Sequence, residues 1–107
     1  MRDRIIHVHK WSRPHPPTEA EIEQLLRDEG LEPYRWGNDP LDVYNVHTHD
    51  YHKVVYVVKG SITFGFAVDG QPTTLHAGDR LDLPEGIAHN AAVGPDGVVC
   101  LEARKQY

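Results

Sequence analysis

The chain has 107 residues, the length of a single domain. Hydrophobic residues make up 39% of it, so there is enough apolar material for a core, which argues against a disordered chain. Sixteen acidic and eleven basic residues give a net charge of −5 at pH 7. This balance argues against nucleic-acid binding, because such proteins neutralise phosphates with clustered lysine and arginine.

Membrane insertion and secretion are not expected either. No apolar run approaches the roughly 20 residues of a membrane span, and the first residues lack the apolar segment of a signal peptide. A single cysteine, Cys100, cannot form an internal disulfide and has apolar neighbours, so we expect a cytoplasmic protein with an inert buried thiol. The unusual count is eight histidines, the first indication of metal chemistry.

The sequence predicts that residues 1–40 form an N-terminal arm and one helix, and that both pack on a β-domain of residues 41–107. His7 and His9 are expected on the exposed face of a short strand, because side chains alternate along a strand. Three aromatic residues of the arm are expected to pack under it or, as an alternative, to cover one mouth of the β-domain and shape a pocket: Trp11, Tyr34 and Trp36.

One amphipathic helix is predicted over residues 18–29. Thr18 and Glu21 have the spacing of a capping box, which satisfies free backbone N–H groups at a helix start. A narrow apolar stripe at helical spacing follows, formed by Ile22, Leu25 and Leu26. Gly30 suits the left-handed position that ends many helices.

From residue 41 onward, short β-rich segments alternate with turn signals. Asp69-Gly70, for example, is typical of a tight hairpin turn. About seven strands at this spacing predict an antiparallel sandwich or barrel, and the lack of alternating helices excludes a parallel sheet. The expected strands are residues 42–48, 53–59, 61–68, 73–76, 80–83, 87–93 and 98–104.

Two segments of the β-domain carry the candidate chemistry. His47 and His49 lie two residues apart on or beside a strand, so both point to the same side and can reach one metal ion. From His47 the sequence reads His-x-His-x3-Lys-x6-Gly, ending at Gly60. A second segment starts at Gly78 and reads Gly-x5-Pro-x-Gly-x2-His, ending at His89.

These segments resemble the paired motifs of the cupin superfamily, Gly-x5-His-x-His-x3/4-Glu-x6-Gly and Gly-x5-Pro-x-Gly-x2-His-x3-Asn. The resemblance covers roughly residues 41–104. It implies an all-β, single-domain protein with a jelly-roll β-barrel, here with one short N-terminal helix. It also implies a metal ion at the centre of the barrel, held by the positions that are His47, His49 and His89 in this sequence.

The sequence departs from the family pattern at three positions. Leu41 replaces the opening glycine and Val93 the final asparagine. The third departure affects the chemistry, because Lys53 occupies the place of the ligand glutamate and a protonated lysine cannot coordinate a metal. If Lys53 points inward, it is a candidate to orient a substrate or transfer a proton. It could then pair with Glu102, whereas His52 could add a fourth ligand if a β-bulge shifts the register.

Two classes of function remain open. The first is a metal-dependent enzyme of the oxygenase, isomerase or lyase type that acts on a small polar molecule. The second is a non-catalytic cupin that binds a small molecule as a sensor or storage protein, with or without metal. Imidazole ligands leave the divalent ion undecided among Fe, Zn, Ni, Mn and Cu. We also expect a homodimer, with Val43, Val54, Val58, Ile5, Ile6 and Val8 as candidates for the contact surface.

Overall fold

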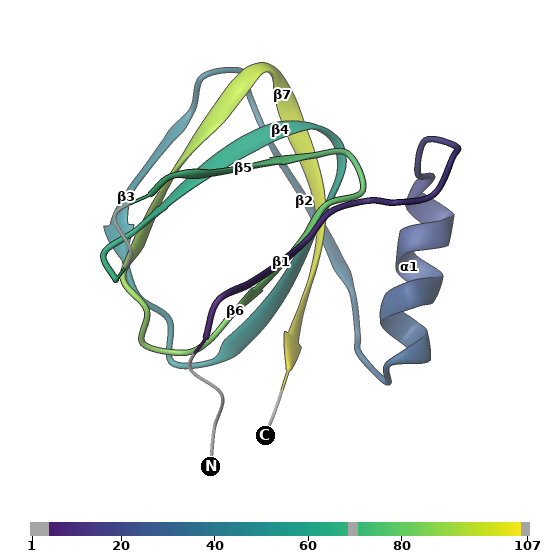
Figure 1. Ribbon diagram of the computed structural model, residues 1–107, viewed down its shortest axis with the longest axis horizontal. Coiled ribbons are helices and arrows are strands. Elements are labelled where there is room, and N and C mark those ends of the chain that lie inside the picture. Colours follow the sequence, from purple (N-terminus) through teal and green to yellow (C-terminus); the bar gives the residue numbers. More distant parts are fainter. Residues whose placement is uncertain (1–4, 69–70, 106–107) are drawn as a thin grey trace.

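The computed structural model describes residues 5–68 and 71–105 (Figure 1). Within these ranges it contains one helix and seven strands. The predicted turn at Asp69-Gly70 lies outside the described residues. In chain order the elements are β1 (His7–His9), α1 (Glu19–Asp28), β2 (Tyr34–Asn38), β3 (Val43–His47), β4 (His52–Phe66), β5 (Thr73–His76), β6 (Arg80–Leu83) and β7 (His89–Lys105).

The strands form an antiparallel sheet in the order β1-β6-β4-β7-β2, while β3 also pairs with β7 and β5 also pairs with β4. The long strands β4 and β7 pair along most of their length and bend, so the sheet curls into a barrel with α1 outside it (Figure 1). The predicted all-β fold, a jelly-roll barrel with one short N-terminal helix, is confirmed.

Glycines explain why β4 and β7 each appear as two strands in the sequence. Gly60 (φ +82°) and Gly97 (φ +78°) adopt left-handed backbone conformations that other residues rarely adopt. A Cβ atom on Gly60 would lie 2.0 Å from the carbonyl oxygen of Gly97. The pairing of β4 with β7 shifts register here but continues on both sides. The glycines therefore bend two continuous strands, where the sequence predicted breaks between separate ones.

Two hydrophobic cores hold the fold together. The first fills the barrel and consists of Val55, Val57, Ile62, Phe64, Phe66, Leu75, Leu81, Leu83, Ile87, Ala91, Val93, Val98 and Cys100. The second lies on the outer face of β4 and β7, where Ile22 and Leu26 of α1 pack on Val54, Tyr56, Leu101 and Ala103. Val54 is fully buried by this packing, so its predicted place on a dimer surface is wrong.

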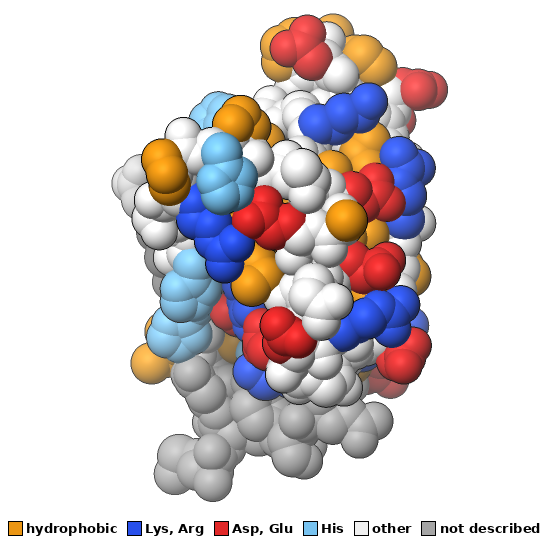
Figure 2. Space-filling view, turned by 90° about the vertical axis from the view of Figure 1, so that its right-hand side faces the viewer, with side chains coloured by type: hydrophobic (Ala, Val, Ile, Leu, Met, Phe, Trp, Pro, Cys, Tyr) orange, Lys and Arg blue, Asp and Glu red, His pale blue; other side chains and the backbone are white. Residues whose placement is uncertain are grey.

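The first forty residues are part of the sheet as well as of the helix. β1 pairs with β6, and β2, which the sequence did not predict as a strand, pairs with β7. α1 begins after the N-cap Thr18 with the predicted capping box. Figure 2 shows the face that carries α1, where acidic and basic side chains are interspersed. Among the described residues no helix is long and apolar enough to cross a membrane.

Candidate metal centre

The side chains of three histidines lie close together in the barrel. His47 ends β3 and His89 begins β7, where the two residues are paired across the strands. His49 lies in the loop between β3 and β4. One ring nitrogen from each side chain lies within 4.8 Å of those of the other two, and His89 is fully buried. The structure thus brings together the three residues that the paired motifs singled out.

The hydrogen bonds of these rings direct their free nitrogens toward each other. Nδ1 of His47 lies 2.7 Å from the carbonyl oxygen of Asn45, and Nδ1 of His89 lies 2.8 Å from that of Ile87. A carbonyl can only accept, so both Nδ1 atoms carry hydrogen and both Nε2 atoms present a lone pair. Nε2 of His49 and of His89 is buried with no hydrogen-bond partner in the described part of the chain. Unpartnered buried lone pairs are costly, and a metal ion would satisfy them.

A backbone hydrogen bond links the two motif segments next to the histidines. The backbone N–H of Gly86 donates to the carbonyl oxygen of His49 at 2.8 Å. Gly86 has φ +79°, so the turn that precedes His89 depends on a glycine at this position. This contact fixes the His49 loop relative to the start of β7.

The histidines lie in the wall of a cavity of about 330 Å³. Aromatic and aliphatic side chains form much of the remaining wall: Tyr34, Trp36, Tyr44, Tyr51, Ile62, Phe64 and Ala91. Asn38, Lys53 and Glu102 add polar groups to it. Such a mixture is typical of small-molecule sites, where apolar walls give shape and a few polar groups fix orientation.

Lys53 and Glu102 form a buried ion pair in this wall. Nζ of Lys53 lies 3.5 Å from Oε1 of Glu102, and the two side chains are only 9% and 5% exposed. The hydroxyl of Tyr34 donates to Oε2 of Glu102, while Nε1 of Trp36 donates to Oε1 at 3.0 Å. Lys53 therefore lines the cavity, and the pairing with Glu102 that the sequence offered as a possibility is present.

Burial and the nearby positive charge of Lys53 favour the neutral forms of His49 and His89. Burial lowers the pKa of His89 to about 4, although its hydrogen bond to Ile87 opposes the shift. The pKa of His49 is also lowered, first by burial and then by the ammonium group of Lys53. Burial and the hydrogen bond to Glu102 raise the pKa of Tyr34. Neutral imidazole is the form that binds metals.

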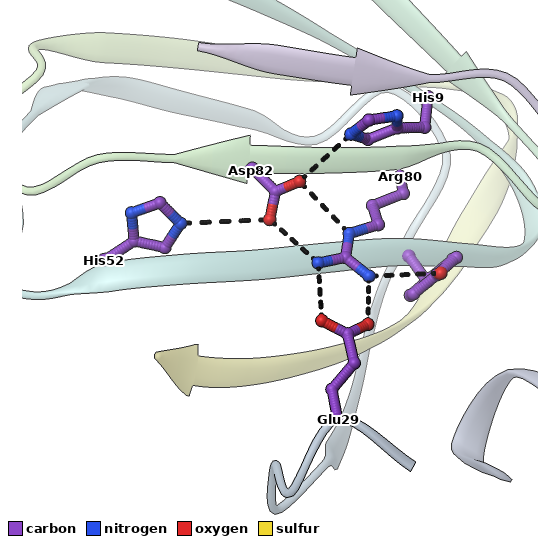
Figure 3. A network of polar contacts seen from close by, with 6 residues as sticks. His9, Glu29, His52, Arg80 and Asp82 are labelled. Carbon is purple, nitrogen blue, oxygen red and sulfur yellow. Dashed lines mark hydrogen bonds and ion pairs between the residues drawn. The ribbon is translucent and has the colours of Figure 1, made fainter. Parts of the chain in front are cut away.

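His52 lies on the opposite face of β4 from the cavity. Its Nε2 is 3.8 Å from Oδ1 of Asp82, and Oδ2 of the same carboxylate is 3.4 Å from Nε2 of His9 (Figure 3). Arg80 bonds to Asp82 at 3.1 and 3.2 Å and also to Glu29 after α1. The geometry thus places His52 in an outer network that connects the helix to β6, and it does not bring it to the other three histidines.

The sequence analysis did not identify two aromatic residues as the groups that hold Glu102. The favoured expectation for Tyr34 and Trp36, packing under the arm, is wrong. The alternative agrees with the structure, because both side chains lie in the cavity wall and donate to Glu102. The available signal was the Tyr-x-Trp alternation, which puts both rings on one face of a strand. Trp11 does pack within the arm, where its indole N–H donates to the carbonyl of His15 at 2.7 Å.

Comparisons with known proteins agree with this architecture. The sequence profile of the family described as "Cupin domain" matches residues 39–102. No curated protein sequence matches the chain. Among solved structures, an RmlC-like cupin from Shewanella frigidimarina is 28% identical over 69% of this chain, with a TM-score of 0.59. This chain covers 64% of that protein's length.

Two further structures show the same fold. KdgF from a Halomonas species is 26% identical, with 72% of this chain and 71% of that one covered and a TM-score of 0.57. A DUF861 family protein from Thermotoga maritima is 16% identical, with 94% of this chain and all of that one covered and a TM-score of 0.63.

Proposed function

The chain belongs to the cupin family, and we propose that it binds one divalent transition metal ion through His47, His49 and His89 and acts on a small polar molecule. The observation that carries the proposal is the arrangement of ring nitrogens. Buried Nε2 atoms converge without a partner among the described residues, and backbone carbonyls hold the opposite ring nitrogens of His47 and His89. Metal-binding histidines are commonly oriented in this way by a second hydrogen bond.

Three neutral ligands would leave the double charge of the ion uncompensated. A bound ion of this kind polarises a coordinated oxygen or lowers the pKa of a bound water. Imidazole ligands suit Fe, Zn, Ni and Cu, and Mn is the fifth candidate. The open coordination positions that remain fit an oxygenase, an isomerase or a lyase.

The protein's own residues would bind and orient the substrate. Trp36, Tyr44 and Phe64 form aromatic walls of the cavity, against which an apolar part of the substrate would pack. Nζ of Lys53 is positioned in the same wall to orient the substrate or to transfer a proton to it, and Glu102 holds the ammonium group in place.

The second candidate is a non-catalytic cupin that binds a small molecule as a sensor or storage protein. It is favoured by the ion pair of Lys53 with Glu102, because a lysine stands where the family motif has a metal-ligating glutamate. The same fold serves both classes, since function depends on the site. Metal-loaded protein that binds small molecules without converting any of them would support this second candidate.

Metal titration tests the proposed site. We expect one ion per chain, and a metal at about 100 times its dissociation constant stabilises the folded state by ~2.7 kcal/mol. For a domain of this size the melting temperature should then rise by on the order of ten degrees. His89→Ala should remove most of the rise. His7→Ala and His9→Ala are matched controls outside the cavity and should keep it, and a parent protein that takes up no Zn, Ni, Mn, Fe or Cu would overturn the proposal.

A further inference from the structure

We propose that the ligand of this cavity is a small carboxylate whose negative charge is bound by Nζ of Lys53. The inference deepens the function proposed above and rests on it for the metal ion beside which the ligand would lie. It is carried by the hydrogen-bonding groups of the cavity wall, most of which are already engaged with each other.

Glu102 has its hydrogen-bonding needs met without a ligand. The Tyr34 hydroxyl donates to one carboxylate oxygen and the Trp36 indole N–H to the other, and the Lys53 ammonium adds an opposite charge. A carboxylate held by two donors and a cation is well compensated in a buried site. Glu102 therefore acts as a positioning residue that keeps the lysine in the wall.

Lys53 is less well satisfied than its partner. An ammonium group has three N–H donors, and among the described residues Nζ forms an ion pair with Glu102 alone, at 3.5 Å. That separation is beyond the usual range of a hydrogen bond. The side chain is 9% exposed, so bulk water has little access to it. The ammonium thus retains donors that a ligand in the cavity could use.

The other polar groups of the wall offer little to a ligand. The Tyr44 hydroxyl donates to the side-chain oxygen of Asn38. Nδ1 of His47 and of His89 face backbone carbonyls. Among the charged groups of the described wall, Lys53 is the one with hydrogen-bond donors to spare, and it lies in the same wall as the three histidines. An anionic oxygen would accept a stronger hydrogen bond from the remaining N–H donors of this ammonium group than a neutral oxygen would.

Size and charge point to the same ligand class. At about 330 Å³ the cavity lies at the lower end of the roughly 300–1,000 Å³ of small-molecule sites, so the ligand is small. Lys53 and Glu102 cancel each other's charge. A divalent ion would give the cavity a double positive charge, which a carboxylate would partly neutralise. The walls of Phe64, Ile62 and Ala91 accommodate a short apolar body.

Lactate and its neutral amide, lactamide, form a matched pair of probes for calorimetric titration into nickel-loaded protein. A metal ion can itself favour lactate, so the informative quantity is the change in the lactate-over-lactamide affinity ratio between variants. Loss of a charge-assisted hydrogen bond weakens binding by about ten-fold or more. Lys53→Met should lower the ratio by that factor. Lys59→Met, an exposed lysine on the same strand, should leave it unchanged.

Glu102→Gln provides a test in the opposite direction. It removes the anion that competes for the ammonium but keeps a side chain of the same size, whose amide oxygen can still hold Lys53 in the wall, so lactate should bind more tightly and lactamide as before. If the pair only stabilised the fold, both variants would weaken the two probes alike, and that result would overturn the inference. Nickel content is measured in every sample, because a parent without metal would refute the proposed function. Chelator-treated parent and Lys53→Met would then still show whether the lysine favours lactate.

Discussion

Among single residues, the buried lysine has the greatest consequence for the site. An isolated ammonium inside a protein is strongly unfavourable, and here Glu102 compensates it at 3.5 Å. An ion pair of this kind adds little net stability compared with apolar residues of similar volume, because removing both charges from water is costly. The pair is thus poorly explained by folding alone, and its place in the cavity wall favours a role in ligand or metal binding.

Lys53 should weaken the binding of a metal ion in the cavity, because its positive charge repels the ion. Lys53→Glu should place an anionic ligand in the position where the family motif has one. We expect metal binding to become roughly ten-fold tighter, which corresponds to about 1.4 kcal/mol. Lys53→Met should also tighten binding, but less, because it only removes a positive charge from beside the ion. Metal titration of the parent and both variants at one pH measures the effect.

The control for this series is Lys59→Met, which removes a charge from the exposed part of β4. It should bind metal as the parent does. Without metal, Lys53→Glu should be less stable than the parent, because it brings a second carboxylate close to Glu102. Equal metal affinities of the parent and both Lys53 variants would show that this position does not influence the ion.

Because of His89, the unfolding free energy of the metal-free protein should fall as the pH is lowered. Its pKa is lowered to about 4 in the folded state, against about 6.5 for an unperturbed histidine. The unfolded chain therefore takes up this proton first as the pH falls from about 6.5 to 4, and protonation favours unfolding. The loss of unfolding free energy should be on the order of 3 kcal/mol at most. Urea unfolding between pH 7 and 4.5, with a chelator present, measures it.

The matched variant for this prediction is His89→Gln, which cannot take up the proton. Its unfolding free energy should fall less steeply over the same pH range, whatever its stability at pH 7. Other groups contribute equally to both proteins and cancel in the comparison; an example is Asp79, where burial raises the pKa but hydrogen bonds from His76, Trp11 and Lys10 lower it further. Parallel pH profiles would contradict the prediction.

At the scale of elements, α1 was predictable from its sequence. The predicted span was 18–29 and the helix is Glu19–Asp28, preceded by the N-cap Thr18. Its ends depend on local chemistry, with the capping box at the start and Gly30 in a left-handed conformation after the end. Such signals involve residues three or four positions apart, which a sequence displays directly.

The helix should contribute to stability without contributing to the metal site. Leu26 is fully buried against the outer face of the sheet, so Leu26→Ala should lower the unfolding free energy by roughly 2–5 kcal/mol. Gln24→Ala, on the exposed side of the same helix, should change it by less than about 0.5 kcal/mol. Urea unfolding measures both. Metal stoichiometry should stay the same in the two variants, and its loss in folded Leu26→Ala would contradict a separate outer core.

The strands and the site were predictable only where the signal is a pattern along the sequence itself. His47, His49 and His89 could be identified because their motif spacing is fixed along the chain. The contacts of Glu102 with Tyr34 and Trp36 depend on the register between β2 and β7, residues more than sixty positions apart. No signal between neighbouring residues specifies that register. For the same reason the sequence did not reveal β2 as a strand or β4 as one strand that continues through Gly60.

At the scale of the whole molecule, the sheet has edges that residues 5–68 and 71–105 do not cover. Within the described ranges, β1 pairs only with β6 and β3 only with β7. Exposed apolar side chains lie on or next to these strands: Ile5, Leu41, Val43 and Val46. Ile6 and Val8, in contrast, pack against the inner core. Of the residues first expected on a dimer surface, Ile5 and Val43 remain exposed.

We expect a closed two-fold dimer that uses the edge formed by β3. Uncovered strand edges are commonly paired or hidden, and two-fold dimers are the most frequent soluble homo-oligomers. Val43 and Val46 are each 68% exposed on this strand, so burying them against a second copy is favourable. Light scattering at micromolar concentration should give twice the chain mass. Val43→Asp should shift the protein toward monomer, while Val68→Asp, at an equally exposed valine after β4, should not; a monomeric parent would refute the expectation.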